Sequence, residues 1–198
     1  MILTDNATDT TKASDVNAKI LVLVGSLRRD SVNRVLARVA AENSPAGVEV
    51  AVYSGLENLP FYNEDIDTDQ VDEAVTRLRD AVAGVDALLI ATPEYNGTIP
   101  AVLKNAIDWL SRPYGAGAIS GKPVGVLGAA LAQYGGKWSH DDTARSVGIA
   151  GGKVVEDVDL HLSIGSLEGK AIADIPEVVE TLRAAVAVLA DHAVTVDA

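Results

Sequence analysis

The segment Gly25–Asn33, with the sequence GSLRRDSVN, carries the polar side chains best suited to hold an anion. Ser26, Ser31 and Asn33 offer hydroxyl and amide donors, and Arg28 offers a guanidinium group. If a helix begins near Ser31, its unpaired backbone N–H groups add to this set. Neither GxGxxG nor the P-loop pattern is present, so a terminal monophosphate is favoured over a pyrophosphate. In the alternative interpretation, Ser31 is only an N-cap, the first glycine only a turn, and both arginines are solvated.

The segment Thr92–Pro100 (TPEYNGTIP) is stiffened by two prolines and contains one glycine and one aromatic residue. Such a loop presents fixed backbone groups, and Tyr95 and Asn96 add side-chain contacts to the edge of a flat heterocycle. The pattern therefore predicts ligand recognition without acid–base chemistry, with Gly97 in a backbone conformation closed to other residues. The alternative is a tight turn whose tyrosine packs on its own helix and in which Glu94 is a solvated charge.

The segment Ala130–Trp138 (ALAQYGGKW) ends in a glycine pair beside two aromatic residues. Gly135 and Gly136 would permit close approach of the backbone to a ligand. Tyr134 and Trp138 would line a planar pocket, or would instead form a lid packed on its own helix.

The remaining chemically active residues indicate neither a metal site nor a catalytic side chain. His140, His161 and His192 fall on a helix start, a late strand and the last helix, without a third ligand at metal spacing, and we expect surface or structural roles. Asp141 and Asp142 read as first-turn charges that favour a helix dipole. The chain has no cysteine, which excludes disulfides, thiolate nucleophiles and cysteine-bound clusters, so redox chemistry would require a bound cofactor.

Short runs rich in Val, Leu and Ile alternate with longer helical patterns, as in a parallel sheet wound with helices. We predict that all the strands are buried on both faces. The predicted strands are Lys19–Val24, Val48–Tyr53, Ala87–Thr92, Pro123–Leu127 and Lys153–Val158. The predicted helices are Ser31–Glu42, Thr68–Val82, Pro100–Ser111, Ser139–Ile149 and Ile175–Val194.

Five alternating units are too few for the six-stranded dinucleotide fold and predict an α/β, doubly wound, five-stranded parallel sheet of order 2-1-3-4-5, with helices on both faces. In such a sheet, ligands bind at the carboxyl ends of strands near the switch point. The three polar segments follow the first, third and fourth strands, so we expect them to meet there.

Residues 1–17 contain little to bury and predict a disordered tail, which leaves residues 18–198 as one ligand-binding domain. The net charge of −12 disfavours binding to nucleic acid or to an anionic membrane surface. The N-terminus resembles no export signal, and no apolar run is long enough to span a bilayer. A cytoplasmic location is the expectation.

Two stretches, GSLRRDSVNR and PEYNGTIPAVLKNAIDWLSRP, resemble the NADPH-dependent FMN reductase family. This flavodoxin-like group includes bacterial quinone and chromate reductases and azoreductases, and the resemblance spans about Ile20 to Val155. It implies FMN phosphate binding by the first segment and isoalloxazine contacts by the second. The third segment matches less closely, because GGKWS stands where the family often has a Gly-Gly-x-Arg-Ala type sequence, which puts substrate specificity in doubt. The cofactor-binding residues that follow are Ser26, Arg28, Ser31, Val32, Asn33, Pro93, Glu94, Tyr95, Asn96, Gly97, Tyr134, Gly135 and Gly136.

The resemblance further implies an NAD(P)H oxidoreductase in which NADPH or NADH reduces bound FMN, which then passes electrons to a quinone, free flavin or similar acceptor. It also implies a homodimer or homotetramer. Helical spacing places Trp109 outside the apolar stripe of its helix, where it would be an exposed interface anchor or would instead cover a neighbouring helix.

Three other functions share the fold. An electron-carrier flavodoxin usually lacks arginine in its phosphate loop. A phosphoacceptor receiver domain needs an aspartate at the end of the third strand, where Thr92-Pro93 stands. A relative that has lost flavin would be colourless.

Overall fold

The computed structural model describes residues 17–131 and 133–196. A parallel sheet of five strands has the order β2-β1-β3-β4-β5, which confirms the predicted topology. Except for Asn17, the predicted tail lies outside the described residues, as does Ala132 of the third polar segment. The strands are β1 (Ala18–Val24), β2 (Val48–Val52), β3 (Ala87–Thr92), β4 (Pro123–Ala130) and β5 (Lys153–Ser163).

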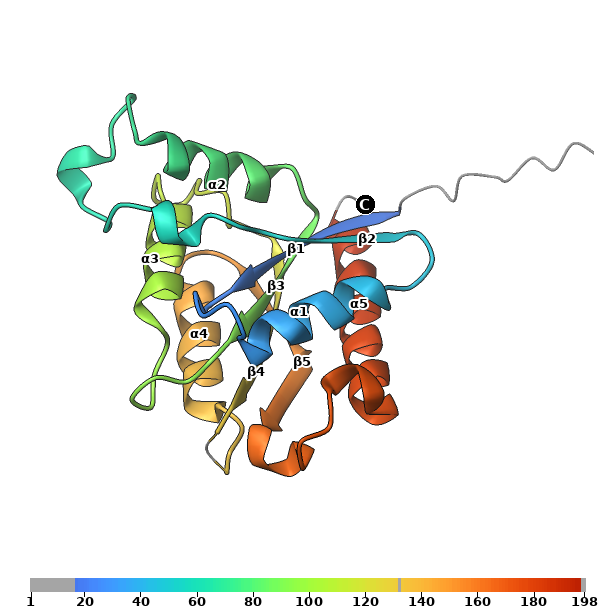
Figure 1. Cartoon of the computed structure of the whole chain (residues 1–198). Helices are drawn as coiled ribbons and strands as arrows, with labels where there is room; N and C mark the ends of the chain where they lie inside the picture. The colour runs from blue at the N-terminus through green and yellow to red at the C-terminus, as the bar shows by residue number, and fades with distance from the viewer. Residues whose placement is uncertain (1–16, 132, 197–198) are drawn as a thin grey trace, which may run out of the picture.

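Helices cover both faces of the sheet. Helices α1 and α5 lie on one face, whereas α2, α3 and α4 lie on the other (Figure 1). Each layer has its own buried cluster of Val, Leu, Ile and Ala side chains, as the low aromatic content requires. Within the described ranges, no helix combines the length and apolar character needed to cross a bilayer. The helices are α1 (Val32–Glu42), α2 (Glu73–Ala83), α3 (Ala101–Leu110), α4 (Lys137–Ile149) and α5 (Pro176–Val196).

The edge strands correct the prediction that all five strands are buried on both faces. Strands β3 and β4 are buried along their whole length, but β2 has no fully buried residue. In β5, Val155, Val158 and Leu162 are buried while the intervening acidic residues reach solvent. An edge strand has a neighbour on one side only, so helices on the two faces cover it incompletely.

The predicted helix at Thr68–Val82 begins later, at Glu73. Asp72 is its N-cap, and the Asp72 carboxylate accepts a hydrogen bond of 2.7 Å from the Ala74 backbone N–H. A short 3-10 turn at Glu64–Ile66 precedes this cap. The cap therefore sets a start that apolar spacing alone places too early.

Trp109 is fully buried, which corrects the expectation that it is exposed. Its indole N–H donates to the Pro60 carbonyl oxygen at 2.8 Å, and its ring meets that of Tyr62 edge to face at 5.0 Å between centroids. The segment around Pro60 folds over α3 and gives the tryptophan an intramolecular partner. Helical periodicity within α3 could not show this contact because the partner lies about fifty residues earlier.

The register of the sheet brings the three polar segments to one edge. Val24, the last residue of β1, pairs with Ala91, and Thr92 at the end of β3 pairs with Gly128 in β4. The connections after β1, β3 and β4 therefore leave the sheet at nearly the same level, as expected at a topological switch point.

Candidate functional site

The first segment, between β1 and α1, forms a loop that carries two buried hydroxyl groups. Ser26 and Ser31 are both buried, and Ser31 is the N-cap residue of α1. The Ser31 side chain makes no capping hydrogen bond, and the first turn of α1 contains no acidic residue. The helix N-terminus therefore has neither a hydroxyl nor a carboxylate of its own to balance its partial positive charge, a condition that favours an external anion.

Arg28 stands at the exposed rim of this loop. Its Nη2 donates to the Asp30 carbonyl oxygen at 2.7 Å, which ties the guanidinium group to its own turn. The remaining guanidinium donors can serve a ligand, because this group has five N–H bonds.

Asn33 has a structural task that its sequence position does not reveal. Its amide nitrogen donates to the Ala129 carbonyl oxygen and its amide oxygen accepts from the Ala129 N–H, both at 2.9 Å and both buried. The pair joins the first turn of α1 to the end of β4. Asn33 thus fixes two walls of the site relative to each other, and most of its hydrogen-bonding capacity is used within the protein.

The second segment is a tight hairpin turn. Asn96 and Gly97 both have positive φ, at 53° and 75°, and Tyr95 and Thr98 exchange two backbone hydrogen bonds across them. Two central residues with positive φ identify the type I′ turn, for which Asn-Gly is the preferred sequence. The Tyr95 side chain is half exposed, and its hydroxyl lies 3.3 Å from Ser26 Oγ. The turn therefore presents its tyrosine to the first segment.

Glu94 fastens the second segment to helix α4. Its Oε2 accepts hydrogen bonds from the backbone N–H groups of Trp138 and Ser139, at 3.1 and 3.3 Å. Ser139 Oγ lies 2.8 Å from the Pro93 carbonyl oxygen and 2.9 Å from Thr92 Oγ1. The carboxylate is thus an N-terminal cap for α4 supplied by another loop, which excludes the solvated charge considered from sequence.

One cavity of about 580 Å³ unites the first two segments. Eight of the predicted cofactor-binding residues line it, together with four residues that were not predicted. Ala129, Ala130 and Leu131 lie at or just after the end of β4, whereas Ile164 comes from the turn after β5 and had no sequence signal. The predicted residues are Ser26, Arg28, Ser31, Val32, Asn33, Pro93, Glu94 and Tyr95; the others are Ala129, Ala130, Leu131 and Ile164.

The third segment contributes less to this cavity than its glycines and aromatic residues predict. Tyr134 and Trp138 are exposed, and neither lines the cavity. A Cβ at Gly97 would come within 3.2 Å of the Trp138 ring, so that ring packs on the hairpin turn. Gly135 has positive φ, and a Cβ there would lie 2.6 Å from the His161 carbonyl carbon. Gly135 therefore allows a close approach of two backbone segments, but its partner is β5 and not a ligand.

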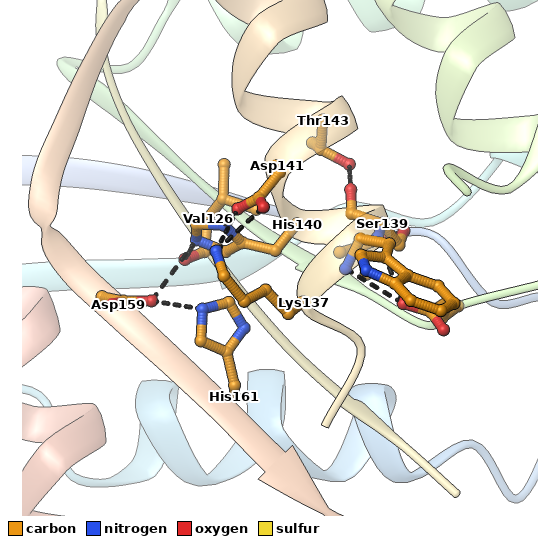
Figure 2. Close-up of polar contacts among 11 residues, drawn as sticks. Val126, Lys137, Ser139, His140, Asp141, Thr143, Asp159 and His161 are labelled. Atoms are coloured by element: carbon orange, nitrogen blue, oxygen red, sulfur yellow. Dashed lines mark hydrogen bonds and ion pairs between the residues drawn. The ribbon is translucent and has the colours of Figure 1, made fainter. Parts of the chain in front are cut away.

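The histidines also depart from expectation. His140 and His161 meet edge to face with ring centroids 4.4 Å apart, and Asp159 lies beside both (Figure 2). The sequence alone does not reveal this group, because His140 is on α4 whereas Asp159 and His161 are on β5. Burial is the main cause that lowers the pKa of His161, and the neighbouring His140 is the second. A hydrogen bond from Lys137 lowers the pKa of Asp141, the residue that follows His140.

The family model for NADPH-dependent FMN reductase matches residues 18–166, which is most of the chain. The chain belongs to the NADPH-dependent FMN reductase family. This membership confirms the resemblance seen in GSLRRDSVNR and PEYNGTIPAVLKNAIDWLSRP.

Individual relatives are consistent with this family membership. A quinone reductase from Pseudomonas putida KT2440 is 44% identical over 117 residues, 59% of this chain and 62% of that protein. A 2-hydroxy-1,4-benzoquinone reductase from Burkholderia sp. is 45% identical over 122 residues, 58% of this chain and 66% of that protein. The matched region thus spans less than two thirds of the length of these relatives. Among solved structures, the FerB flavoenzyme NAD(P)H:(acceptor) oxidoreductase from Paracoccus denitrificans gives a TM-score of 0.79 at 30% identity, covering 89% of this chain and 97% of FerB.

Proposed function

We propose that this chain is an FMN-dependent NAD(P)H oxidoreductase that passes electrons to a small-molecule acceptor such as a quinone or free flavin. The observation that carries the proposal is a cavity of about 580 Å³ lined by both family segments at the carboxyl ends of the central strands. The relatives' names, quinone reductase and NAD(P)H:(acceptor) oxidoreductase, support this reaction class.

The first segment fits the phosphate of FMN. Its donors are the hydroxyls of Ser26 and Ser31, the Arg28 guanidinium group and the uncapped N-terminus of α1. All are neutral donors or cations, so a dianionic phosphate would meet no acceptor-only group within this segment's part of the cavity. Asn33 would act as a positioning residue, because its pair with Ala129 holds α1 against β4.

The rest of the cavity fits a flat, largely apolar ring. Pro93 and Tyr95 form one wall, and Ala129 to Leu131 form another. Bound FMN would supply the redox chemistry by accepting a hydride and then releasing electrons to the acceptor. The protein would hold and orient the ring, and we assign no side chain as acid or base. Asn96 and Gly97 would shape the hairpin that places Tyr95, while Tyr134, Gly135 and Gly136 would act only at the margin.

A second cavity of about 480 Å³ borders the first and shares Arg28 and Tyr95 with it. Its lining includes Leu27, Leu56 and Phe61, so it is largely apolar, and the Leu27 and Phe61 side chains are exposed to solvent. NADPH or NADH, and then the oxidised acceptor, would reach the ring through this cavity. An arginine at its border suits the negative charge of a nicotinamide dinucleotide.

A homodimer or homotetramer is part of the proposal. Tyr114 is 87% exposed and Ile149 is 78% exposed, and both line a cavity of about 410 Å³ beside α3 and α4. Covering these side chains in a subunit contact would remove a large apolar area from water.

The decisive experiment measures FMN and riboflavin binding to the flavin-free protein. We expect FMN to bind much more tightly, and the loaded protein to oxidise NADPH or NADH rapidly when a quinone is present. Arg28→Ala should weaken FMN binding by about 1.5–3 kcal/mol, the range for a charge-assisted hydrogen bond, and should leave riboflavin binding nearly unchanged. Equal affinity for FMN and riboflavin would remove the phosphate assignment. Tight FMN binding without NAD(P)H oxidation would instead identify an electron carrier.

A further inference from the structure

Two histidines and an aspartate converge between α4 and β5, away from the FMN cavity (Figure 2). The Asp159 Oδ1 atom lies 2.5 Å from His161 Nε2 and 3.9 Å from His140 Nε2. One nitrogen or oxygen atom of each residue lies within 4.8 Å of the others. In a zinc site, each nitrogen or oxygen ligand lies about 2.0–2.2 Å from the ion. Small rotations of the three side chains would bring their ligand atoms to that distance from one shared ion.

The fold holds these three residues on rigid elements. Asp159 and His161 are two positions apart on β5, so both side chains point to the same face of the strand. The His161 backbone packs against Gly135, whose missing Cβ allows the contact. His140 is in the first turn of α4, which Glu94 caps. Ligands on a strand and a capped helix are positioned before any ion arrives.

The donor chemistry selects the class of ion. Two imidazoles and one carboxylate suit Zn²⁺, Ni²⁺, Co²⁺ or Cu²⁺, whereas Mg²⁺ and Ca²⁺ prefer oxygen ligands alone. The nitrogen of His161 that faces Asp159 is Nε2, while Nδ1 is buried without a hydrogen-bond partner among the described residues.

The surroundings attract a cation. A cavity of about 190 Å³ borders the group and is lined by the carboxylates of Asp141, Glu156 and Asp159, with Lys137 as the cation that faces them. Lys137 is paired with Asp141 at 2.8 Å, which leaves the other two carboxylates to set the local charge. The net charge of −12 acts in the same direction.

We propose that His140, Asp159 and His161 bind one divalent transition-metal ion of the zinc type, at a site separate from the FMN cavity. The ion replaces the hydrogen bond that His140 Nε2 makes to the Val126 carbonyl oxygen at 3.0 Å. It then links α4 directly to β5. The site is structural, because it opens on a small cavity away from the proposed flavin ring.

The test is calorimetric titration of the chelator-treated, tag-free 198-residue chain with ZnCl₂. We expect one equivalent of Zn²⁺ to bind and MgCl₂ to give no binding. His161→Ala and Asp159→Asn should each weaken Zn²⁺ binding by at least about tenfold, the lower end of the loss seen even for supporting residues of metal sites. His192→Ala, which removes an exposed histidine on α5, is the matched control and should bind Zn²⁺ like the parent chain.

Thermal unfolding provides a second readout that also covers a variant that folds poorly. An ion that binds only the folded chain raises the melting temperature, by an amount that grows with the logarithm of the free ion concentration once that exceeds the Kd. Zinc should raise it for the parent chain and for His192→Ala, and should fail to do so for Asp159→Asn, which preserves side-chain size. The proposal is overturned if the parent chain binds no Zn²⁺, or if binding and thermal shift persist in Asp159→Asn and in His161→Ala.

Discussion

Removing the Asn33 side chain tests how the two walls of the FMN cavity are held together. Asn33→Ala deletes both hydrogen bonds to Ala129, each 2.9 Å long and buried. The Ala129 N–H and C=O would then lack partners. A buried group left unpaired costs about 1–3 kcal/mol, so the two groups together give a range of about 2–6 kcal/mol. Because Ala129 borders the cavity, water can partly replace the amide, and we expect a loss of about 2–4 kcal/mol.

The same helix provides a control. Asn43, at the other end of α1, donates from its side chain to the Val39 carbonyl oxygen at 2.8 Å, and its backbone N–H also reaches that oxygen. Asn43→Ala therefore leaves no group unpaired and should cost no more than about 1 kcal/mol.

Urea unfolding of both flavin-free variants measures these losses, provided that the slopes match that of the parent chain. FMN titration of the same samples should show weaker binding for Asn33→Ala only. A loss for Asn33→Ala below about 1 kcal/mol, or equal to that of Asn43→Ala, would refute the assigned bridging role of Asn33.

Three further substitutions test other parts of the structure. Gly97→Val places a β-branched residue at a φ of 75° with its Cβ against Trp138, and should lower both FMN affinity and the melting temperature, with a conformational cost of about 1–2 kcal/mol. Glu94→Gln removes a charge from the N-terminus of α4 and should reduce the free energy of unfolding by about 0.3–1 kcal/mol in urea at pH 7. Trp109→Phe removes one part-buried hydrogen bond and part of a fully buried ring, and should cost at least about 0.5–1.5 kcal/mol without changing the sedimentation coefficient; dissociation into smaller species would restore an interface role.

The fold was predictable because its signals are local. Apolar runs such as Ala87–Thr92 coincide with a strand of the structure, and five of them in alternation with helical patterns lead to the observed strand order. The burial of β5 was misjudged although its alternation of Val158, Asp159 and Leu160 indicates one solvent-facing side. The prediction ended β5 at Val158, five residues before its end at Ser163.

The site was predictable only in part, because its decisive contacts join distant segments. Local patterns identified the hydroxyls of the first loop and the Asn-Gly turn of the second. They could not show that Asn33 is committed to Ala129, that Glu94 caps α4, or that Trp109 is covered by Pro60. Each of these contacts spans more than forty residues, and no property of either partner alone specifies it.

The first turn of α4 connects the two proposed sites through adjacent residues. Ser139 and the Glu94 carboxylate fix this turn to the second loop, on the side of the FMN cavity. His140, the next residue, points instead to Asp159 and His161 on β5 (Figure 2). Without an ion, the hydrogen bond from His140 to Val126 fastens that side of the turn to β4. An ion bound at the proposed metal site would instead attach this turn to β5. Because Glu94 accepts hydrogen bonds from backbone N–H groups of the same turn, both proposals depend on the position of one helical turn.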